Sequence, residues 1–396
     1  MHIVRYKYRQ VPRARGEMSD MLFVYSPLET LGFLLAGFVI ALLTGLLAVL
    51  ADKIIRGPPK SVWGLRASMT STVAALILGF AGLLALVANY AGAGQAWIYS
   101  GLAFFSLLML LQWLFSPSII NAVYRTRPPG RGEEWLVSKV EELARKAGLK
   151  RTPKLRIAEV DAPNAFAYSS PIKGSYVAVT RGLLRTMPRE EITAVLAHEI
   201  GHLKHKDVAV ILALSLLPVA LYYVGRSMLM WGWLAGSRER GNAQLYYMGL
   251  GIALAAVGCL FHFIVMHFSR LREYYSDAFS GMLTGAPRSL QRALARLAIT
   301  YETSPEITQT ISKSAALLFI VNYLIDATGG MAIEPLWGRP RRREVIIGDI
   351  DRAVEELMRR EEGGVRELFS THPPIPKRLR FLESLRLSIE SIGSIK

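Results

Sequence analysis

An uncharged stretch of unusual length constrains this chain more than any other feature. No charged residue occurs from Ala67 to Tyr124, whereas a helix needs only about 20 apolar residues to cross the core of a bilayer. One crossing cannot use so many residues, and the glycine-rich segment AGAGQ at 91–95 divides the stretch near its middle. The stretch therefore predicts two membrane-spanning helices, roughly at 70–90 and 96–117.

Further apolar segments have the length of a membrane span. One lacks charge from 30 to 51, and two others occupy 208–225 and 241–269. Together with the first two, they predict five spans. The apolar segment 315–325 is too short to cross, so we expect it to pack into a soluble part.

The composition fits a protein with both membrane and soluble parts. Hydrophobic residues make up 52% of the 396 residues and charged residues 20%, which is too apolar for an ordinary soluble protein and too charged for spans alone. The net charge is +16. Basic residues of membrane proteins gather at the cytoplasmic lipid surface, so this charge indicates contact with membrane lipid rather than with nucleic acid. Cys259 is the single cysteine and excludes an internal disulfide.

Short basic connectors predict the orientation. The connectors at 52–66 and 124–132 are both short and basic, which places them on the cytoplasmic side of the membrane. The N-terminal segment 1–29 is also basic, yet it would lie outside if segment 30–51 crosses; a re-entrant first segment would remove the conflict. We predict a multi-pass protein of the cell membrane.

The soluble residues indicate helices and a small sheet. Apolar residues recur at helical spacing over 132–149. Segments 154–160, 164–170 and 175–180 alternate or run apolar between turn residues, as short strands do. The expected fold class is an α+β membrane protein with transmembrane helices and a mostly helical soluble domain that contains a small β-sheet. We expect five regions: a basic N-terminal segment (1–29), a membrane region (30–121), a first soluble part with the sheet (122–207), a second membrane region (208–269) and a mostly helical second soluble part (270–396).

The segment HEIGH at 198–202 has the spacing of a zinc hydrolase site. On a helix, His198 and His202 lie on one face, so both imidazoles can bind a single tetrahedral ion. Glu199 then lies beside the ion, where it can act as general base toward a bound water whose pKa the metal lowers. Pro188 and two acidic residues form a good helix start just upstream. The pattern predicts one Zn²⁺ per chain.

The third ligand is not local. Seven residues of helix place His205 about 10 Å from His198 along the axis, too far to share an ion held at about 2 Å. The segment SRLREYYSD, which follows the fifth span, offers Glu273 and Asp277 on one helical face. One carboxylate could complete the ligand set and the other could orient a ligand histidine. A surface salt bridge between Arg270 and Glu273 is the competing interpretation.

Four ordered segments resemble those of the HtpX-like membrane metalloproteases of the M48 class, over about residues 30 to 385. They are NAFA (164–167), AHEIGH (197–202), SRLREYYSD (269–277) and FSTHPPIPKRLRFL (369–382). The resemblance implies a gluzincin-type catalytic domain in which His198, His202 and Glu273 bind zinc, Glu199 is the catalytic base and the active site faces the cytosol. Asp277 matches an acid that orients a ligand. These proteases typically have two spans before the zinc helix, whereas three are counted here.

The resemblance also assigns residues around the substrate. The residues that resemble the family's substrate-edge segment are Asn164, Ala165, Phe166 and Ala167. An edge strand can hold an extended peptide by strand addition, and Asn164 could hydrogen-bond the scissile region. His372 and Arg378 resemble positions beside the metal in related prenyl-protein proteases, where a donor could stabilise the oxyanion. A turn histidine and a lipid-facing arginine are the competing interpretations.

The sequence therefore predicts an integral-membrane zinc endopeptidase. The resemblance implies that it cleaves misfolded or damaged membrane proteins at the cytoplasmic face. Its partners would be membrane lipid and polypeptide substrates, with a homo-oligomer left open. One alternative is a protease that trims prenylated C-terminal motifs, which the small number of spans disfavours. Another is a non-catalytic scaffold or transporter with structural histidines. Glu199 argues against a scaffold, because a structural zinc site is closed by four protein ligands and needs no base.

Overall fold

The computed structural model describes residues 62–90, 95–235, 242–303, 349–360 and 370–393. The described helices are α2 (Val62–Tyr90), α3 (Gln95–Val123), α4 (Glu134–Lys146), α5 (Arg181–Thr186), α6 (Arg189–Lys204), α7 (Asp207–Ala235), α8 (Asn242–Thr284), α9 (Pro287–Thr303), α12 (Ile350–Arg359) and α14 (Ile375–Gly393). The strands are β1 (Thr126–Arg127), β2 (Lys154–Ala158), β3 (Ala165–Ser170) and β4 (Gly174–Thr180). The protein is thus mostly helical with a small mixed sheet, as predicted. The predicted first span and segment 315–325 lie outside the described residues.

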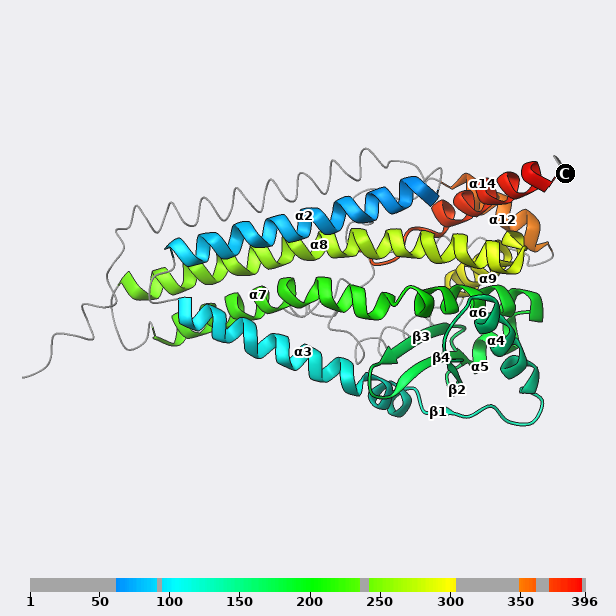
Figure 1. Ribbon diagram of the computed structural model, residues 1–396, viewed down its shortest axis with the longest axis horizontal. Coiled ribbons are helices and arrows are strands. Elements are labelled where there is room, and N and C mark those ends of the chain that lie inside the picture. The colour runs from blue at the N-terminus through cyan, green and yellow to red at the C-terminus, as the bar shows by residue number, and fades with distance from the viewer. Residues whose placement is uncertain (1–61, 91–94, 236–241, 304–348, 361–369, 394–396) are drawn as a thin grey trace, which may run out of the picture.

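Long helices run side by side along the molecule, and the soluble elements gather at one end of them (Figure 1). Three described helices are long and apolar enough to cross a membrane, namely Ile98–Val123 in α3, Asp207–Met230 in α7 and Tyr247–Thr284 in α8. They overlap the predicted third, fourth and fifth spans. Helix α2 contains the predicted second span and packs beside α8, and its crossing stays a prediction.

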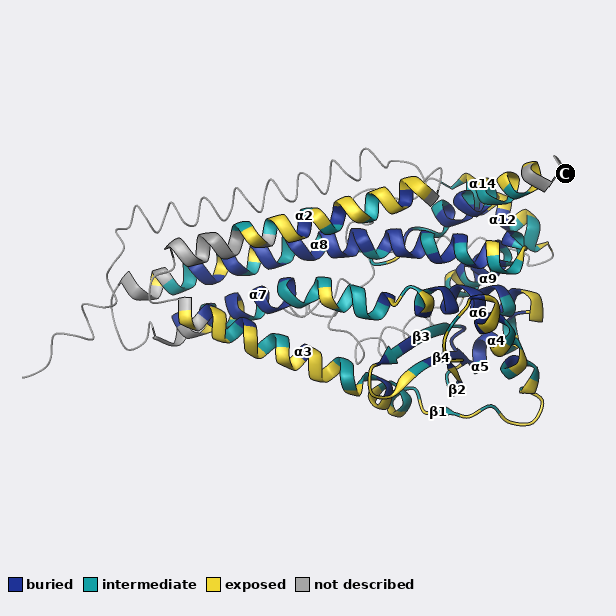
Figure 2. Ribbon diagram, in the orientation of Figure 1, coloured by how far each residue is buried: buried dark blue, intermediate teal, exposed yellow. Residues whose placement is uncertain are grey.

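Helix α8 connects the membrane region to the catalytic end. Its 43 residues correspond to about 65 Å of helix, roughly twice the thickness of the hydrocarbon core. Figure 2 shows that α8 is buried along most of its length, whereas α2 and α3 expose their outer faces. A single unbroken helix therefore carries the segment SRLREYYSD from the predicted fifth span into the soluble core.

The sheet has the strand order β1-β2-β4-β3, which leaves β3 at an edge. Strand β4 pairs in parallel with β2 and antiparallel with β3. The predicted strands at 154–160, 164–170 and 175–180 are confirmed as β2, β3 and β4, and the predicted helix at 132–149 is confirmed as α4. Strand β1 is only two residues long, too short to show the alternation that identifies a strand from sequence.

One hydrophobic core joins the sheet to the helices around it. Leu196 and Ile200 of α6 are fully buried in a cluster that also contains Ile157 of β2 and Val179 of β4. Leu379 of α14 belongs to the same cluster. The helix that carries the HEIGH segment therefore packs between the sheet and C-terminal helices. This packing fixes the orientation of the helix face that carries the two histidines.

Candidate active site

Helix α6 begins where the sequence predicts and is held at its start. Pro188 is the N-cap, and Glu190 and Glu191 lie in the first turn, where acidic side chains favour the helix dipole. Glu191 is buried and makes a bidentate ion pair with Arg296 of α9, with N···O distances of 2.8 and 3.0 Å. This pair fixes the orientation of α6 against α9.

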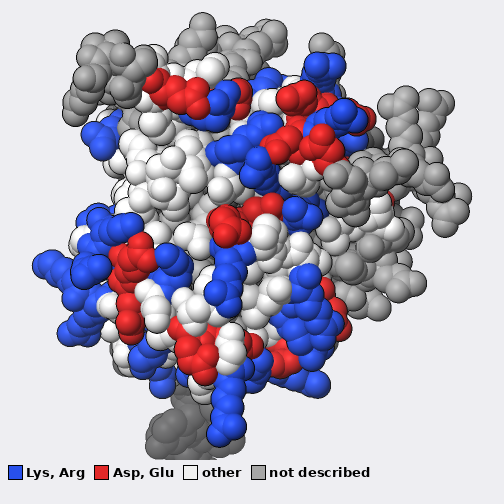
Figure 3. All heavy atoms as spheres, turned by 90° about the vertical axis from the view of Figure 1, so that its right-hand side faces the viewer, with Lys and Arg blue, Asp and Glu red and all other residues white. Residues whose placement is uncertain are grey.

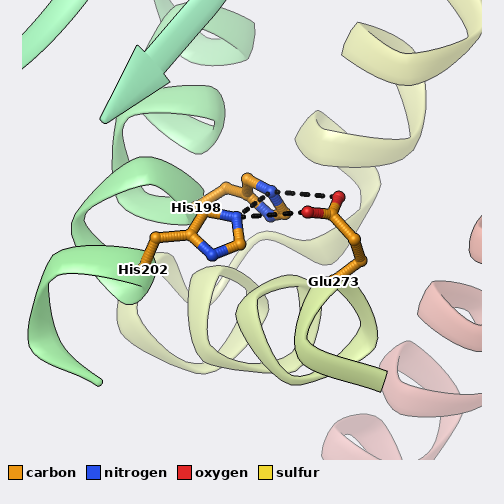
Figure 4. Close-up of side chains that lie close together, drawn as sticks. All are labelled: His198, His202 and Glu273. Carbon is orange, nitrogen blue, oxygen red and sulfur yellow. Dashed lines mark hydrogen bonds and ion pairs between the residues drawn. The ribbon is translucent and has the colours of Figure 1, made fainter. Parts of the chain in front are cut away.

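The predicted ligands converge on one point. Figure 4 shows the imidazoles of His198 and His202 from α6 facing the carboxylate of Glu273 from α8. The two Nε2 atoms are 3.1 Å apart. The Glu273 oxygens lie 3.8 Å from Nε2 of His198 and 3.5 Å from Nε2 of His202. These three residues are the group in the described part of the chain that could hold a metal ion.

The spacing of these atoms fits a tetrahedral ion. Ligand atoms bound at about 2.0 Å around a tetrahedral zinc are separated from one another by about 3.3 Å. The two Nε2 atoms are 3.1 Å apart, close to this value, and the nearest carboxylate oxygens are Oε1 of Glu273, 3.5 Å from Nε2 of His202, and Oε2, 3.8 Å from Nε2 of His198. Two imidazole nitrogens and a carboxylate oxygen are also the donor types that zinc accepts in catalytic sites. The residues present therefore fit the metal that the sequence predicts.

An acidic residue contacts the Nδ1 atom of His198, on the opposite side of the ring from Nε2. Asp277, one turn beyond Glu273 on α8, is fully buried, and its Oδ1 lies 3.0 Å from Nδ1 of His198. Arg378 of α14 donates to both carboxylate oxygens of Asp277, at 2.6 and 2.8 Å. Asp277 thus lies where a residue that orients His198 would lie, and the orienting role that the resemblance implies stays a prediction.

A second acidic residue, which the sequence reasoning missed, contacts His202. Asp207 is 2% exposed, and its Oδ2 lies 2.7 Å from Nδ1 of His202. Arg272 of α8 donates to the other oxygen of Asp207. The signal in the sequence is an acid five residues after the second histidine, placed just before the uncharged run that begins at Val208. Lys206, with φ of 56°, makes the sharp turn that brings Asp207 back to the site.

The carboxylates around His202 favour positive charge. Burial alone would lower the pKa of His202, but the hydrogen bond with Asp207 and the charges of Glu273 and Glu199 raise the pKa to about 9. A field that holds a proton on an imidazole equally attracts a metal cation. Glu199 itself is 9% exposed and lies one residue along α6 from His198, and its role as the base stays a prediction.

His372 and Arg378 both reach the ligand Glu273. Nδ1 of His372 lies 3.0 Å, and Nη1 of Arg378 lies 3.1 Å, from Oε2 of Glu273. The negative charge of Glu273 raises the pKa of His372, whose side chain is 66% exposed. Arg378 is buried among acids, so the interpretation of a lipid-facing arginine is wrong. Arg270 and Glu273 are buried too, which contradicts a surface salt bridge between them.

The predicted substrate segment forms the edge strand. The main chain of Asn164 is bound to Thr180, with Asn164 N donating to the Thr180 hydroxyl at 2.8 Å and Thr180 N donating to Asn164 O at 2.9 Å. Ala165 and Ala167 pack against the core cluster that contains α6, and Phe166 packs against the ring of Tyr124 at 4.7 Å. Strand β3 thus lies alongside the helix that bears the histidines.

His205 does not belong to the group of described residues that could hold a metal ion. Its ring packs edge-on against Tyr275 and Phe279 of α8, with centroid distances of 4.6 and 5.2 Å. It is also the C-cap residue of α6, so it lies at the end of the helix that carries His198 and His202. The geometry agrees with the distance argument against His205 as a ligand.

Comparison with known proteins gives the family. The family model described as Peptidase family M48 matches residues 131–386, which include every residue of the site. The chain belongs to peptidase family M48. It is 49% identical over 335 residues to a Protease HtpX homolog of Aeropyrum pernix, covering 82% of this chain and 99% of that protein.

Other members of the M48 family are similar over most of their length. A Protease HtpX homolog of Archaeoglobus fulgidus is 33% identical and covers 93% of this chain and 99% of the relative. A Protease HtpX homolog of Pyrobaculum calidifontis is 38% identical and covers 77% of this chain and 82% of the relative. The crystal structure of S. mikatae Ste24p matches with a TM-score of 0.44 at 19% identity, over 72% of this chain and 58% of Ste24p.

The M48 assignment confirms the predicted enzyme class. The protein is an HtpX-type metalloprotease with membrane helices, a metal-dependent hydrolase that acts on polypeptides, rather than a non-catalytic scaffold. The fold class and the family resemblance are confirmed as well. The roles of the individual site residues stay predictions.

Proposed function

We propose that this M48 protease is a zinc endopeptidase that cleaves misfolded or damaged membrane proteins at the cytoplasmic face of the cell membrane. The observation that carries the proposal is the convergence of His198, His202 and Glu273 on one position, with atom separations that suit a tetrahedral ion. Glu199 directly follows His198 on α6, its charge raises the pKa of His202, and it is not one of the converging ligands. Three protein ligands leave the fourth coordination position open, which is the arrangement of catalytic sites.

The residues of the site divide the work of peptide hydrolysis. Zinc supplies Lewis-acid chemistry there, acidifying water and polarising a peptide carbonyl. Glu199 takes the proton from the attacking water and passes it to the leaving amine. Asp277 and Asp207 hold the two imidazoles in the tautomer that keeps each Nε2 free for the metal. The exposed imidazole of His372 can donate to the developing oxyanion.

Arg378 has a different role from the one the resemblance implies. Its guanidinium is engaged by Asp277 and Glu273, at 2.6 to 3.1 Å. All three nitrogens of this buried guanidinium face the two carboxylates, whereas the imidazole of His372 is exposed and has a second nitrogen besides the one near Glu273. We therefore assign Arg378 to positioning these two acids, and the oxyanion to His372.

Two features support membrane proteins as substrates and the cytoplasm as the site of cleavage. Helix α8 runs unbroken from the predicted fifth span, which ends at Ser269, to Glu273, so the site lies close to the predicted membrane boundary. The basic connectors at 52–66 and 124–132 predict the cytoplasmic side, and the start of α2 and the end of α3 lie at the catalytic end of the molecule (Figure 1). A polypeptide that leaves the bilayer on this side is close to the metal ligands.

The test is metal analysis combined with cleavage of casein and of a membrane protein. We expect Glu199→Gln to keep its zinc and to lose cleavage by about 10²- to 10⁴-fold, because a general base supplies that range. Glu190→Gln is the matched control, since Glu190 is exposed in the first turn of the same helix. Glu273→Gln should lose zinc. Equal cleavage by wild type and Glu199→Gln would refute the base assignment.

A further inference from the structure

The edge strand β3 offers alternate residues to a peptide. In an antiparallel pair, successive residues direct their N–H and C=O groups toward the partner strand and away from it in turn. Thr180 N donates to Asn164 O, so Asn164 and every second residue after it point toward β4. The groups of Ala165, Ala167 and Ser169 therefore point to the free edge. An extended peptide that adds to β3 must bond with these groups.

One end of this edge is closed by a membrane helix. The indole Nε1 of Trp113, on α3, donates to the carbonyl oxygen of Ser169 at 3.0 Å. The same helix is fastened to β3 by a second contact, in which the hydroxyl of Tyr168 donates to Oδ1 of Asn121 at 2.6 Å. A peptide donor that reached Ser169 would find the carbonyl occupied and the indole in its path.

The opposite end is closed by α9. The hydroxyl of Tyr301 donates to the carbonyl oxygen of Pro163, two residues before Ala165. Proline has no N–H, so position 163 offers no donor either. Within the described part of the chain, hydrogen bonds are made to the outward carbonyl oxygens of Pro163 and Ser169. The outward main-chain groups of Ala165 and Ala167, which lie between them, are therefore available to a substrate.

We propose that Trp113 and Tyr301 limit the substrate-pairing edge to a two-residue window formed by Ala165 and Ala167. This inference rests on the proposed function, because it assumes that the peptide binds by strand addition. Main-chain pairing is then confined to the few substrate residues around the scissile bond, and the rest of the polypeptide leaves the sheet. Trp113 and Tyr301 act as specificity-determining residues: they set how long an extended segment the site can recognise.

Main-chain methylation of a peptide substrate tests the window. The probe is a fluorogenic peptide that spans a cleavage site mapped in casein, with each peptide nitrogen N-methylated in turn. Each methyl group removes one donor, and loss of one hydrogen bond lowers kcat/KM by about 3- to 10-fold. In wild type we expect two sensitive positions, two residues apart, that pair with the carbonyls of Ala165 and Ala167.

Conservative variants should widen the window at opposite ends. Trp113→Phe frees the carbonyl of Ser169 and keeps an aromatic ring, so a third sensitive position should appear two residues beyond one end of the pair. Tyr301→Phe frees the carbonyl of Pro163, and its new sensitive position should appear beyond the other end. Trp113→Ala also removes the bulk of the ring. Phe115→Ala, an exposed residue of the same helix, is the control and should leave the wild-type profile unchanged.

The outcomes separate this inference from the proposed function. If N-methylation lowers kcat/KM at three or more positions with the wild-type enzyme, the two-residue window is overturned, and no variant is needed for that conclusion. The same two positions in Trp113→Phe, Trp113→Ala and Tyr301→Phe, each with full zinc content, overturn the roles of the two residues. Failure of wild type to cleave casein, or full cleavage by Glu199→Gln, instead overturns the proposed function itself.

Discussion

Helix α8 meets its neighbours in two different ways along its length. In the membrane region it packs against α7 at glycines: a Cβ added to Gly225 would lie 2.6 Å from Gly251 O, and one added to Gly258 would lie 2.7 Å from Pro218 O. At the catalytic end the same helix is held by buried charges, such as Asp277 with Arg378. Close backbone contact therefore holds α8 to its neighbour in the membrane region. Buried ion pairs hold it at the end that carries the predicted metal ligands.

The difference follows from what each environment can supply. Lipid tails are as apolar as leucine, so helices in a bilayer gain from close packing of small residues rather than from hydrophobic burial. In the soluble core, each buried acid at the site needs a cation or a hydrogen-bond donor beside it. Figure 3 shows that the outer surface of the catalytic end also carries basic and acidic side chains interspersed. Breaking each kind of contact should therefore give a different result.

The largest effect is expected from Arg378→Leu. The change leaves Asp277 and Glu273 buried without their common cation, and removal of one partner from a buried pair costs about 3–5 kcal/mol. We expect the free energy of unfolding in detergent to fall by that amount and the zinc content to fall with it. Chemical unfolding followed by circular dichroism, with metal analysis, measures both.

A partly exposed arginine on the same helix gives the control. Arg386 of α14 pairs with Glu383 and Glu390, and the side chain of Glu390 is 58% exposed. Surface pairs contribute about 1 kcal/mol or less, so Arg386→Leu should keep both stability and zinc. Equal losses in the two variants would mean that burial of the charges does not govern the catalytic end.

A smaller effect is expected at the glycine contact. A Cβ at Gly251 would lie 2.7 Å from Gly225 O and 2.9 Å from Leu229 N, which are backbone atoms that cannot move aside. Gly251→Ala should lower the stability of the helix pair by about 1–3 kcal/mol, the usual range for overpacking. Because the catalytic end is held by its own contacts, zinc affinity should change little.

Thermal unfolding in detergent and a zinc titration test this separation. Gly82→Ala is the matched control, since nothing lies within 4 Å of an added Cβ at that position of α2. A loss of zinc affinity in Gly251→Ala that equals its loss of stability would contradict the independence of the two ends.

The parts of the site that are local in sequence could be predicted, and those that depend on packing could not. The spacing of His198 and His202 follows from helix periodicity alone, and the long apolar segments follow from the thickness of a bilayer. Glu273 is 71 residues beyond His202, so helix periodicity cannot connect the two residues. Before the family resemblance was considered, a metal ligand and a surface salt bridge were equally good interpretations of Glu273. Asp207 gave no periodic signal, because its contact depends on a turn with positive φ at Lys206. The pairing of β3 at an edge likewise depends on sheet topology.

Asp207 joins the two regions and provides the last test. It is the first residue of the membrane helix α7, and its carboxylate bridges His202 and Arg272. Asp207→Asn keeps the shape and removes the charge that orients the imidazole, and loss of such a partner lowers metal affinity by about 10- to 100-fold. Competition with a chelator measures the affinity.

The control for Asp207→Asn is Asp161→Asn, at a side chain that is 66% exposed and bound to surface arginines. Its zinc affinity should equal that of wild type. If Asp207→Asn keeps wild-type zinc affinity but unfolds more easily, Asp207 only fastens α7 to α8 through Arg272. If it loses zinc while the unfolding of the metal-free protein is unchanged, the start of the membrane helix is part of the metal site. A displacement of α7 in the bilayer would then change the orientation of the predicted ligand His202.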